Sequence, residues 1–320
     1  MPTVTVIIPV KNRPEFLKRC LMSIDEQRNL QEKVEVIVVD DNSVDNTVAV
    51  AREWAEGPHQ EHLTARLATV SGHGAAAARN HGARLATGRW LLFFDSDDVM
   101  RPDHLSNVTA AIKEHDGNAD LIGWDVIHVK SPSKKRVKFK TEDTMYEHLM
   151  HGLLSTQRYC LTRSAFAESG GYNKNLMGWD DWELGVRLLM NGVRIAKSNA
   201  KKTGVEVTIH DESITGRSFS HYPERWEDAI NAVREEAVRR GRYDLLFWVD
   251  LKAVILAADY YLEGVEGEAK RLLEETLKQV PDVKARKRLK RLYLSKLVTK
   301  RGTARLARLF IPAPQAVEEK

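Results

Sequence analysis

The sequence predicts an α/β fold with a mostly parallel sheet flanked by helices, followed by an all-helical C-terminal extension. Over the first 130 residues, short apolar segments alternate with segments of helical spacing. This alternation predicts right-handed crossovers and parallel strands. The apolar segments are almost continuously apolar, as in a sheet with both faces covered. From Tyr222 onward every segment has helical spacing.

The first part of the chain contains five predicted strands and four predicted helices. The strands, rich in Val, Ile, Leu and aromatic residues, are residues 4–10, 34–41, 63–70, 90–95 and 120–129. The helices are residues 14–27, 45–56, 75–87 and 102–115. Pro14 and Pro102 fit first-turn positions, and Ser43 or Asp45 is a candidate cap for the second helix. Because open parallel sheets bind ligands beyond the carboxyl ends of their strands, the site is expected there.

The second part begins with a basic, polar stretch. Residues 131–140, SPSKKRVKFK, predict a surface loop or a linker. A short helix at 145–151, a strand at 156–162, a glycine-rich loop at 168–178 and a helix at 180–192 follow. Breaks near Gly241, at 264–267 and near Pro281 divide the remainder into two or three antiparallel helical pairs.

The composition is that of a globular protein expected to reside in the cytosol. The chain has 320 residues, 42% of them apolar, which is enough to bury a core. No apolar run approaches the roughly 18 residues of a membrane span, and the N-terminus MPTVTVIIPVKN lacks signal-peptide features. Cys20 and Cys160 have no metal-binding spacing, so both are expected to be buried thiols.

Acidic residues end two of the predicted strands, at the same edge of the sheet. Asp40 and Asp41 end the second strand, whereas Asp95, Asp97 and Asp98 end the fourth in FFDSDD. Carboxylates at alternate positions share a face and suit Mg²⁺ or Mn²⁺, which prefer oxygen ligands. An Asp-rich turn that caps the next helix is the alternative. At the other strand end, a carboxylate can accept hydrogen bonds from a base N–H or a ribose hydroxyl.

The segment GHGAAAARNHG, residues 72–82, combines glycines with an alanine-rich helix. It allows a ligand to approach the backbone and brings Arg79 and Asn80 within reach of a phosphate or sugar. A tightly packed helix with Arg79 at the surface is the alternative. The glycines do not match GxGxxG after the first strand, which argues against a nicotinamide dinucleotide site.

Two further segments carry candidate site residues. In GWDDWELGVRL, Asp180 and Asp181 open a helix between Trp179 and Trp182, as in many carbohydrate-facing surfaces. Capping of the positive helix end is an equally physical role for this acidic pair, and Glu183 and Arg187 are spaced to pair along the helix. In VTIHDESIT, His210 is either structural or a third metal ligand.

Four motifs together resemble the family 2 glycosyltransferases, which have the GT-A fold. They are IIPVKNRPEFLKRCLMSI, VIVVDDNSVDNT, AAAARNHGARLATGRWLLFFDSDD and GGYNKNLMGWDDWELGVRLL, and the resemblance covers about residues 3–215. It implies inverting transfer of a sugar from a nucleotide-sugar donor, UDP-sugar being the commonest choice, to an acceptor hydroxyl, with Mn²⁺ or Mg²⁺. It also implies a role in bacterial surface polysaccharide or glycoconjugate synthesis.

Matched by position, the resemblance assigns roles to individual residues. It gives Pro9 and Val10 to the nucleotide pocket, Asp40 to the base, Arg79 to the donor, Asp95 to the ribose or sugar, Asp97 to the metal, His210 to the metal or diphosphate, and Ser213 to a serine that follows this histidine. It implies that Asp181 is the catalytic base. Since Gly178 and Trp179 precede the acidic pair where the family often has an acidic residue and Asp after two glycines, Asp180 stays an alternative.

The resemblance also divides the chain. It implies a catalytic domain at residues 1–220, with donor binding at about 1–130 and the acceptor side at about 131–220, and a helical region at 221–320. From Lys284 to Arg308 the chain has eleven Lys or Arg and no acidic residue. Leu289, Leu292, Tyr293 and Leu297 are spaced to form an apolar face, which predicts a helix at 284–310 lying on an anionic membrane surface.

This region and the whole chain also allow other interpretations. The same apolar face suits packing on the preceding helices with solvated charges outside, and the C-terminal helices suit a homo-oligomer. Nucleic acid is not expected, because aromatic residues are sparse among the charges. A sugar nucleotidyltransferase usually has a glycine-rich basic loop where this chain has PVKNRPEF. A non-catalytic nucleotide-sugar-binding module would not need both Asp97 and Asp181.

Overall fold

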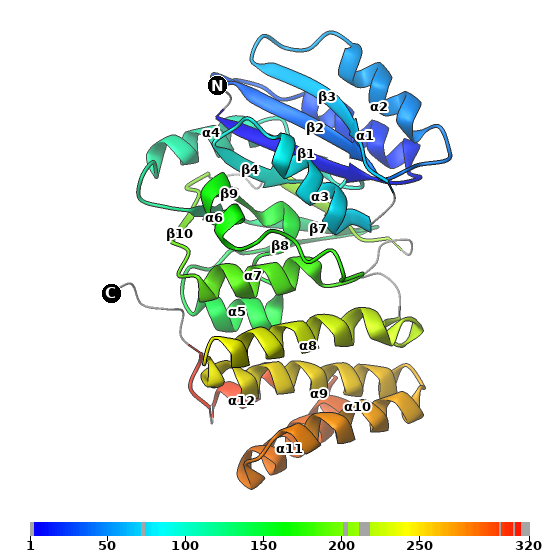
Figure 1. Cartoon of the computed structure of the whole chain (residues 1–320), viewed down its shortest axis with the longest axis vertical. Coiled ribbons are helices and arrows are strands. Elements are labelled where there is room, and N and C mark those ends of the chain that lie inside the picture. The colour runs from blue at the N-terminus through cyan, green and yellow to red at the C-terminus, as the bar shows by residue number, and fades with distance from the viewer. Residues whose placement is uncertain are drawn as a thin grey trace.

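A computed structural model of the chain describes residues 3–71, 74–200, 204–210, 218–300, 302–309 and 311–314. Its main sheet has the strand order β10-β6-β9-β4-β1-β2-β3 (Figure 1). These strands are β1 (Val4–Val10), β2 (Val34–Asp40), β3 (Leu63–Thr69), β4 (Trp90–Phe93), β6 (Leu121–Gly123), β9 (Tyr159–Thr162) and β10 (Ile195–Lys197). Only β9 runs antiparallel to its neighbours, which confirms a mostly parallel sheet.

Helices cover both faces of this sheet, as the continuously apolar strands predict. They are α1 (Pro14–Asp25), α2 (Thr47–Glu56), α3 (Gly74–Leu85), α4 (His104–Glu114), α5 (Thr144–His151), α6 (Arg163–Glu168) and α7 (Asp180–Met190). On β1, Val6 and Ile8 point to the core shared with α1, α2 and α4, whereas Ile7 points to the core shared with α3 and α7. This alternation follows from the two-residue period of a strand. The expected thiols Cys20 and Cys160 are buried.

A second, four-stranded sheet corrects two expectations from the sequence. Its order is β5 (Val99–Met100), β11 (Val205–Thr208), β7 (Val126–Lys130) and β8 (Ser133–Val137). The strand predicted at 120–129 is therefore two strands, β6 and β7, in different sheets. The stretch 131–140 is not a loop, because β8 pairs antiparallel with β7 as an edge strand. Its exposed lysines suit such an edge, since charged side chains discourage pairing with another chain.

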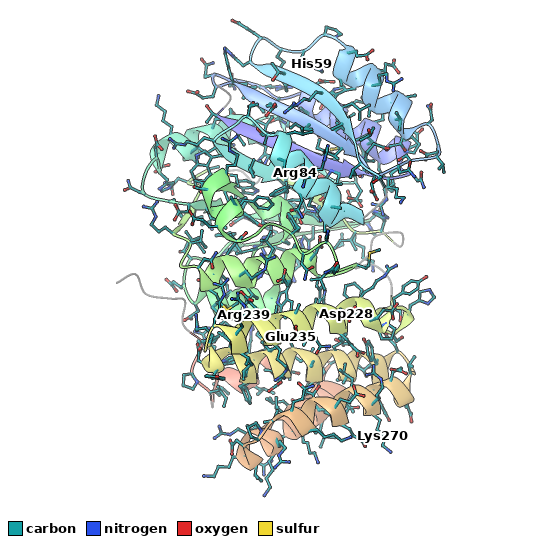
Figure 2. All side chains as sticks on the ribbon, viewed as in Figure 1. His59, Arg84, Asp228, Glu235, Arg239 and Lys270 are labelled. Atoms are coloured by element: carbon teal, nitrogen blue, oxygen red, sulfur yellow. The ribbon has the colours of Figure 1, made fainter. Side chains whose placement is uncertain are left out.

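The C-terminal helices pack beneath α5 and α7, at the end of the molecule away from β3 (Figure 1). They are α8 (Pro223–Arg239), α9 (Leu246–Leu262), α10 (Glu266–Gln279), α11 (Val283–Thr299) and α12 (Thr303–Arg308). The outer side of α8 carries Asp228, Glu235 and Arg239 (Figure 2), whereas its inner side buries Trp226 and Val233. One hydrophobic core runs from Ile7 of the sheet to Leu289 of α11.

The ends of these helices agree with the breaks that the sequence predicts near Gly241, 264–267 and Pro281. Gly241 and Gly264 have positive φ angles, a conformation that glycine adopts without strain at a helix end. Within the described ranges, the chain contains no helix of the length and apolarity that crossing a bilayer requires.

Candidate active site

The acidic strand ends meet at one edge of the main sheet. The Asp41 N–H donates to the Val10 carbonyl at the end of β1, and the Phe94 N–H donates to the Ile7 carbonyl of the same strand. The expectation that both acidic clusters open at one edge is therefore confirmed. The two strands are not direct neighbours, because β1 lies between β2 and β4.

Three carboxylates gather where the chain leaves β4. Carboxylate oxygens of Asp95, Asp97 and Asp98 lie within 4.8 Å of one another. The side-chain amide of Gln157, in the short 3₁₀ helix Thr156–Arg158, donates to both Asp95 and Asp98. The backbone N–H of Thr208 on β11 donates to Asp98 over 2.8 Å. A neighbouring strand and a neighbouring turn therefore hold the cluster in place.

This cluster fits a divalent cation. Burial, with the nearby charges of Asp95 and Asp97, holds the pKa of Asp98 well above its usual range. Burial also raises the pKa of Asp95, an effect that Arg79 opposes and Asp97 adds to. Repulsion among close carboxylates raises their pKa values. A hard cation that prefers oxygen ligands would relieve this repulsion. Asp97, with its neighbours Asp95 and Asp98, is the group of residues that would hold Mn²⁺ or Mg²⁺.

The side chains of Arg13 and His210 both contact Asp97. Arg13 Nη1 lies 2.8 Å from Asp97 Oδ2, and His210 Nε2 lies 3.0 Å from the same oxygen. The His210 ring stacks on Phe16 of α1 with 4.6 Å between ring centroids. The structure therefore brings His210 to the predicted metal residue. Ser213, which the resemblance pairs with His210, lies outside the described residues.

Arg79 on α3 connects the acidic cluster to the acidic pair of α7. Its Nη2 lies 2.7 Å from Asp95 Oδ1, and its Nη1 lies 2.7 Å from Asp180 Oδ2. The guanidinium also lies 5.1 Å from the ring centroid of Tyr172. Burial would lower the pKa of Arg79, but Asp180 and Asp95 raise it well above its usual range. Arg79 is therefore a buried, permanently charged link, and the alternative of a surface arginine is wrong.

The two acids that open α7 have different surroundings. Asp180 is paired with Arg79, whereas Asp181 forms no ion pair within the part of the chain that the structure describes. Asp181 accepts a hydrogen bond from the Trp182 N–H over 2.8 Å. Burial, followed by the charge of Asp180, raises the pKa of Asp181 to about 7. Of the two, Asp181 is the carboxylate tuned to exchange a proton near neutral pH.

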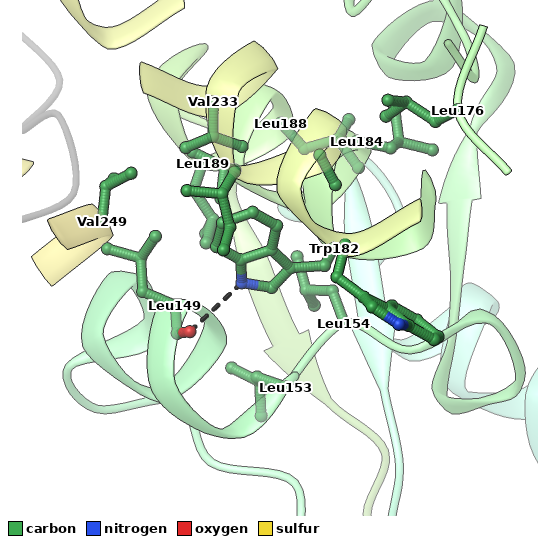
Figure 3. Close-up of a cluster of buried hydrophobic side chains, with 14 of the residues drawn as sticks. Leu149, Leu153, Leu154, Leu176, Trp182, Leu184, Leu188, Leu189, Val233 and Val249 are labelled. Atoms are coloured by element: carbon green, nitrogen blue, oxygen red, sulfur yellow. Dashed lines mark hydrogen bonds between the residues drawn. The ribbon is translucent and has the colours of Figure 1, made fainter. Parts of the chain in front are cut away.

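Hydrogen bonds join the first turn of α7 to α5. The Trp182 indole N–H donates to the Leu149 carbonyl over 3.2 Å (Figure 3), and the Trp182 carbonyl lies 2.8 Å from His148 Nε2. Leu154 N–H donates to the other ring nitrogen of His148, so Nε2 carries the proton. Trp182 is 3% exposed and packs among leucines. The expectation that Trp182 faces a carbohydrate is therefore wrong, whereas Trp179 is partly exposed.

Most of the site residues predicted from the sequence line one cavity of about 420 Å³. Its lining includes Pro9, Val10, Arg79, Asp95, Asp97, Trp179, Asp180 and Asp181. Asp40 lines a neighbouring hollow instead, together with Ser43 and Ser71. Its Oδ2 accepts from Ser43 N–H over 3.0 Å, but its buried Oδ1 has no hydrogen-bond partner within the described ranges. A buried acceptor of this kind calls for a donor.

Sequence reasoning missed several side chains that build the site. Gln157 carries no sequence signal, because its role depends on two aspartates about 60 residues away. Arg13 lies in the motif PVKNRPEF, shortly after the first strand. A basic residue at that place in the sequence could have indicated a contact with the acidic strand ends. Asn80 does not reach toward the cavity as expected, because its amide oxygen and nitrogen bond the backbone of Tyr172. The predicted Glu183–Arg187 pair forms, with 2.6 Å between Nε and Oε1.

Comparisons with known proteins match this architecture. A PGL/p-HBAD biosynthesis glycosyltransferase from Mycobacterium tuberculosis is 29% identical over 198 residues, which cover 61% of this chain and 73% of the relative. The S. aureus TarS fragment 1–349 in complex with UDP-GlcNAc superposes with a TM-score of 0.66 at 17% identity, over 96% of this chain and 92% of the fragment. The chain spans 53% of a longer TarS structure.

A mannosyltransferase from Pyrobaculum calidifontis, in complex with GDP-Man and Mn²⁺, gives a TM-score of 0.55 at 21% identity and covers 97% of this chain and 87% of the mannosyltransferase. These likenesses support the GT-A fold expected from the sequence, with its central sheet, flanking helices and C-terminal helical region. The model of the family described as Glycosyl transferase family 2 matches residues 5–174, a segment that ends before Asp180. The chain belongs to glycosyltransferase family 2.

Proposed function

We propose that this glycosyltransferase transfers a sugar from a UDP-sugar to an acceptor hydroxyl with inversion at the anomeric carbon. The observation that carries this proposal is that one cavity is lined both by the carboxylates of Asp95 and Asp97 and by that of Asp181. Arg79 fixes the relation of the two sides through its ion pairs with Asp95 and Asp180. Such an arrangement suits a leaving group at one end and an attacking hydroxyl at the other.

In this proposal Asp181 is the catalytic base. The acceptor oxygen forms a new bond to the anomeric carbon while the bond from that carbon to the diphosphate oxygen breaks. The acceptor proton passes to Asp181, and the bonding electrons leave with the nucleotide diphosphate. A base whose pKa is about 7 is half deprotonated at neutral pH and accepts the proton without a large energetic penalty. Attack from the face opposite the leaving group inverts the configuration.

The acidic cluster and the basic residues near it are assigned to the leaving diphosphate. A Mn²⁺ or Mg²⁺ ion held by Asp97, with His210 beside it, would supply Lewis-acid stabilisation of the negative charge on that group. Arg13 now pairs with Asp97 at 2.8 Å and can add a positive charge to the same end of the cavity. Asp95, fixed by Arg79 and Gln157, is assigned to a ribose or sugar hydroxyl.

The nucleotide is assigned to the other strand ends. Pro9 and Val10 line the cavity, and the unpartnered Oδ1 of buried Asp40 is suited to a base N–H in the neighbouring hollow. UDP is preferred because the TarS fragment that superposes over 96% of this chain was solved with UDP-GlcNAc. The mannosyltransferase solved with GDP-Man makes guanine the alternative that the experiment must separate.

The decisive experiment is a screen of UDP-, GDP- and dTDP-sugars for release of nucleotide diphosphate by the full chain with Mn²⁺. We expect release from at least one UDP-sugar, and its loss in Asp181→Asn. Product NMR with an identified acceptor then reports the anomeric configuration. Formation of a nucleoside triphosphate and a sugar 1-phosphate when pyrophosphate is added to the nucleotide sugar would support the nucleotidyltransferase alternative. Nucleotide-sugar binding without turnover would support the binding module.

We assign the acceptor side to residues 131–220 and the wall below it to the helical region 221–320. Trp179 lines the cavity beside Asp180 and Asp181, and its ring packs on Trp226 of α8. An acceptor built from sugars suits an aromatic wall of this kind, because sugar rings present C–H faces to indole rings. A bacterial surface polysaccharide or glycoconjugate, the class that the family resemblance implies, is the proposed acceptor class, and the similar PGL/p-HBAD biosynthesis glycosyltransferase from Mycobacterium tuberculosis is a bacterial enzyme.

The proposed location of the acceptor is the anionic inner leaflet of a membrane. The face of α11 that contacts this surface is not the one predicted from the sequence. Leu289 is fully buried, and Leu292 and Tyr293 pack against the same core. That face of α11 therefore covers α9. The outward face of α11 instead carries Lys287, Lys290 and Arg291 together with the exposed side chains of Leu294 and Val298. Basic residues around exposed apolar side chains suit an anionic bilayer.

Co-sedimentation tests this surface. The full chain is expected to bind vesicles that contain about 30% phosphatidylserine and to bind pure phosphatidylcholine vesicles weakly, because roughly 1 kcal/mol is gained per basic residue near an anionic surface. The triple variant Lys287→Gln, Lys290→Gln, Arg291→Gln should lose most of this binding. Lys270→Gln on α10 is the control. Equal binding by the triple variant would remove the membrane from the proposal and leave a solvated face.

A further inference from the structure

Trp179, the residue directly before the acidic pair, has a backbone conformation that tryptophan rarely adopts. Its φ is 49° and its ψ is 28°, in the left-handed region, and it forms the N-cap position of α7. For a residue other than Gly, Asn or Asp this conformation has an energetic cost and persists only where the surroundings hold it. The side chain of Trp179 must therefore make contacts that offset this cost.

Those contacts come from the C-terminal helices. The ring centroid of Trp179 lies 5.2 Å from that of Trp226 on α8 and 6.0 Å from that of Phe219. Gly178 packs so closely on α8 that a Cβ there would lie 3.1 Å from the Trp226 ring. The backbone that leads into Asp180 and Asp181 is therefore seated on the helical region.

Lys252 on α9 adds a charge to this contact. Its Nζ lies 4.4 Å from the ring centroid of Trp179 and 5.7 Å from that of Trp182. These two tryptophans flank the acidic pair in sequence, so the ammonium group lies close to the segment that carries Asp181. At such distances an ammonium group is attracted to the face of an indole ring.

Lys252 and Asp181 attract each other, and each has further charged or titratable neighbours. Burial lowers the pKa of Lys252 to about 8, while the attraction of Asp259 and Asp181 opposes this effect. Lys296 on α11 and His148 and His151 on α5 also face this charge. Around Asp181 the other charged or titratable groups are Asp180, Arg79, Asp95, Tyr159 and Tyr172. Because Coulomb attraction is mutual, a charged Lys252 stabilises the Asp181 carboxylate.

We propose that Lys252 is a positioning residue for the catalytic pair: from α9 it holds the ring of Trp179 and supplies a positive charge to the segment that carries Asp181. The C-terminal helices thereby take part in the reaction, although none of their residues touches the acidic cluster among the described contacts. This inference rests on the proposed role of Asp181 as the base. It adds a second function to the helical region, distinct from any contact with an acceptor or a membrane.

The test is a carboxyl titration that does not depend on activity. The full chain is labelled with aspartate carrying ¹³C at the side-chain carboxyl, and the Asp181 signal is identified by its loss in Asp181→Asn. We expect its titration midpoint to move up by about 0.5–1 pH unit in Lys252→Met, because one nearby positive charge is lost. Lys252→Arg, which keeps the charge, should retain the wild-type midpoint. Lys270→Met removes an exposed lysine of α10 (Figure 2) and is the matched control.

An unchanged midpoint in Lys252→Met would overturn the inference. If that variant does not fold, Lys252→Gln removes the same charge while keeping a polar end, and its midpoint decides. The second readout is the pH dependence of nucleotide diphosphate release, whose acidic limb should move up with the midpoint in Lys252→Met and stay in place in Lys252→Arg. Absence of release by the wild-type protein would refute the proposed function, whereas the carboxyl titration would still decide the role of Lys252.

Discussion

Arg79 and Asp180, 101 residues apart in the sequence, form an ion pair with 2.7 Å between Nη1 and Oδ2. This contact joins α3, which packs on β1 and β2, to the first turn of α7. The other terminal nitrogen of Arg79 binds Asp95. Asp180 is therefore held in an ion pair, whereas its neighbour Asp181, the proposed base, is not paired within the described residues.

The first prediction concerns Asp181 and pH. Asp181→Asn should lower turnover by roughly 10² to 10⁴ while leaving binding of UDP, measured by calorimetry, unchanged. In the wild-type protein the pKa of Asp181 is raised to about 7, so the base is lost by protonation as pH falls below 7. Turnover should therefore decrease about tenfold per pH unit below about pH 6.5. A rate independent of pH between 5 and 7 would contradict this assignment.

The second prediction concerns the anchor. Arg79→Met leaves Asp95 and Asp180 without their shared buried cation, and an uncompensated buried charge typically costs about 3–5 kcal/mol. We expect a marked decrease in the free energy of unfolding, measured by urea denaturation, together with loss of turnover. Arg84→Met changes an exposed arginine of the same helix (Figure 2) and should leave both nearly unchanged. A stable Arg79→Met protein with full turnover would exclude the anchor role.

The third prediction concerns the metal. Asp97→Asn should weaken Mn²⁺ binding in the presence of UDP by at least about tenfold, since it removes one charged oxygen ligand. Isothermal titration calorimetry measures this affinity. Asp228→Asn, an exposed residue of α8, is the control (Figure 2). Treatment with EDTA should abolish nucleotide diphosphate release by the wild-type protein, and Mn²⁺ should restore it. Release that persists in EDTA would rule out a metal-dependent reaction.

The fourth prediction concerns the support beneath α7. A Cβ at Gly185 would collide with the ring of His148, which binds the Trp182 carbonyl. Gly185→Ala should therefore lower the free energy of unfolding by about 1–3 kcal/mol through overpacking. Gly267→Ala, in α10 where a Cβ meets nothing within 4 Å, should instead raise it by about 0.5–1 kcal/mol. Thermal unfolding of both variants checks the contrast.

Local pattern was sufficient for most of the first 115 residues. The predicted strand at 4–10 coincides with β1, and Pro14 begins α1 as expected. Apolar strands separated by amphipathic helices carry a strong periodic signal, because each face of the sheet needs covering. The signal weakened at 120–140, where β6 is only three residues long and exposed β8 lacks an apolar face. Pairing, not propensity, makes these segments strands: β6 pairs with β9 and β10, which are distant in the sequence, and β8 pairs with β7 directly before it.

The sequence by itself determined the fold class, the family motifs and the carboxylates at the strand ends, because strand direction and side-chain alternation follow from local periodicity. Only the tertiary structure decided that Asp180, at the start of α7, is held in an ion pair and that Asp181 beside it is not, within the described residues. The ion pair of Asp180 with Arg79, the bridge of Gln157 to Asp95 and the approach of Lys252 to Trp179 join elements that are far apart in the chain. Such contacts, and the pKa shifts that burial produces, depend on which surfaces pack together, and one-dimensional pattern does not encode that.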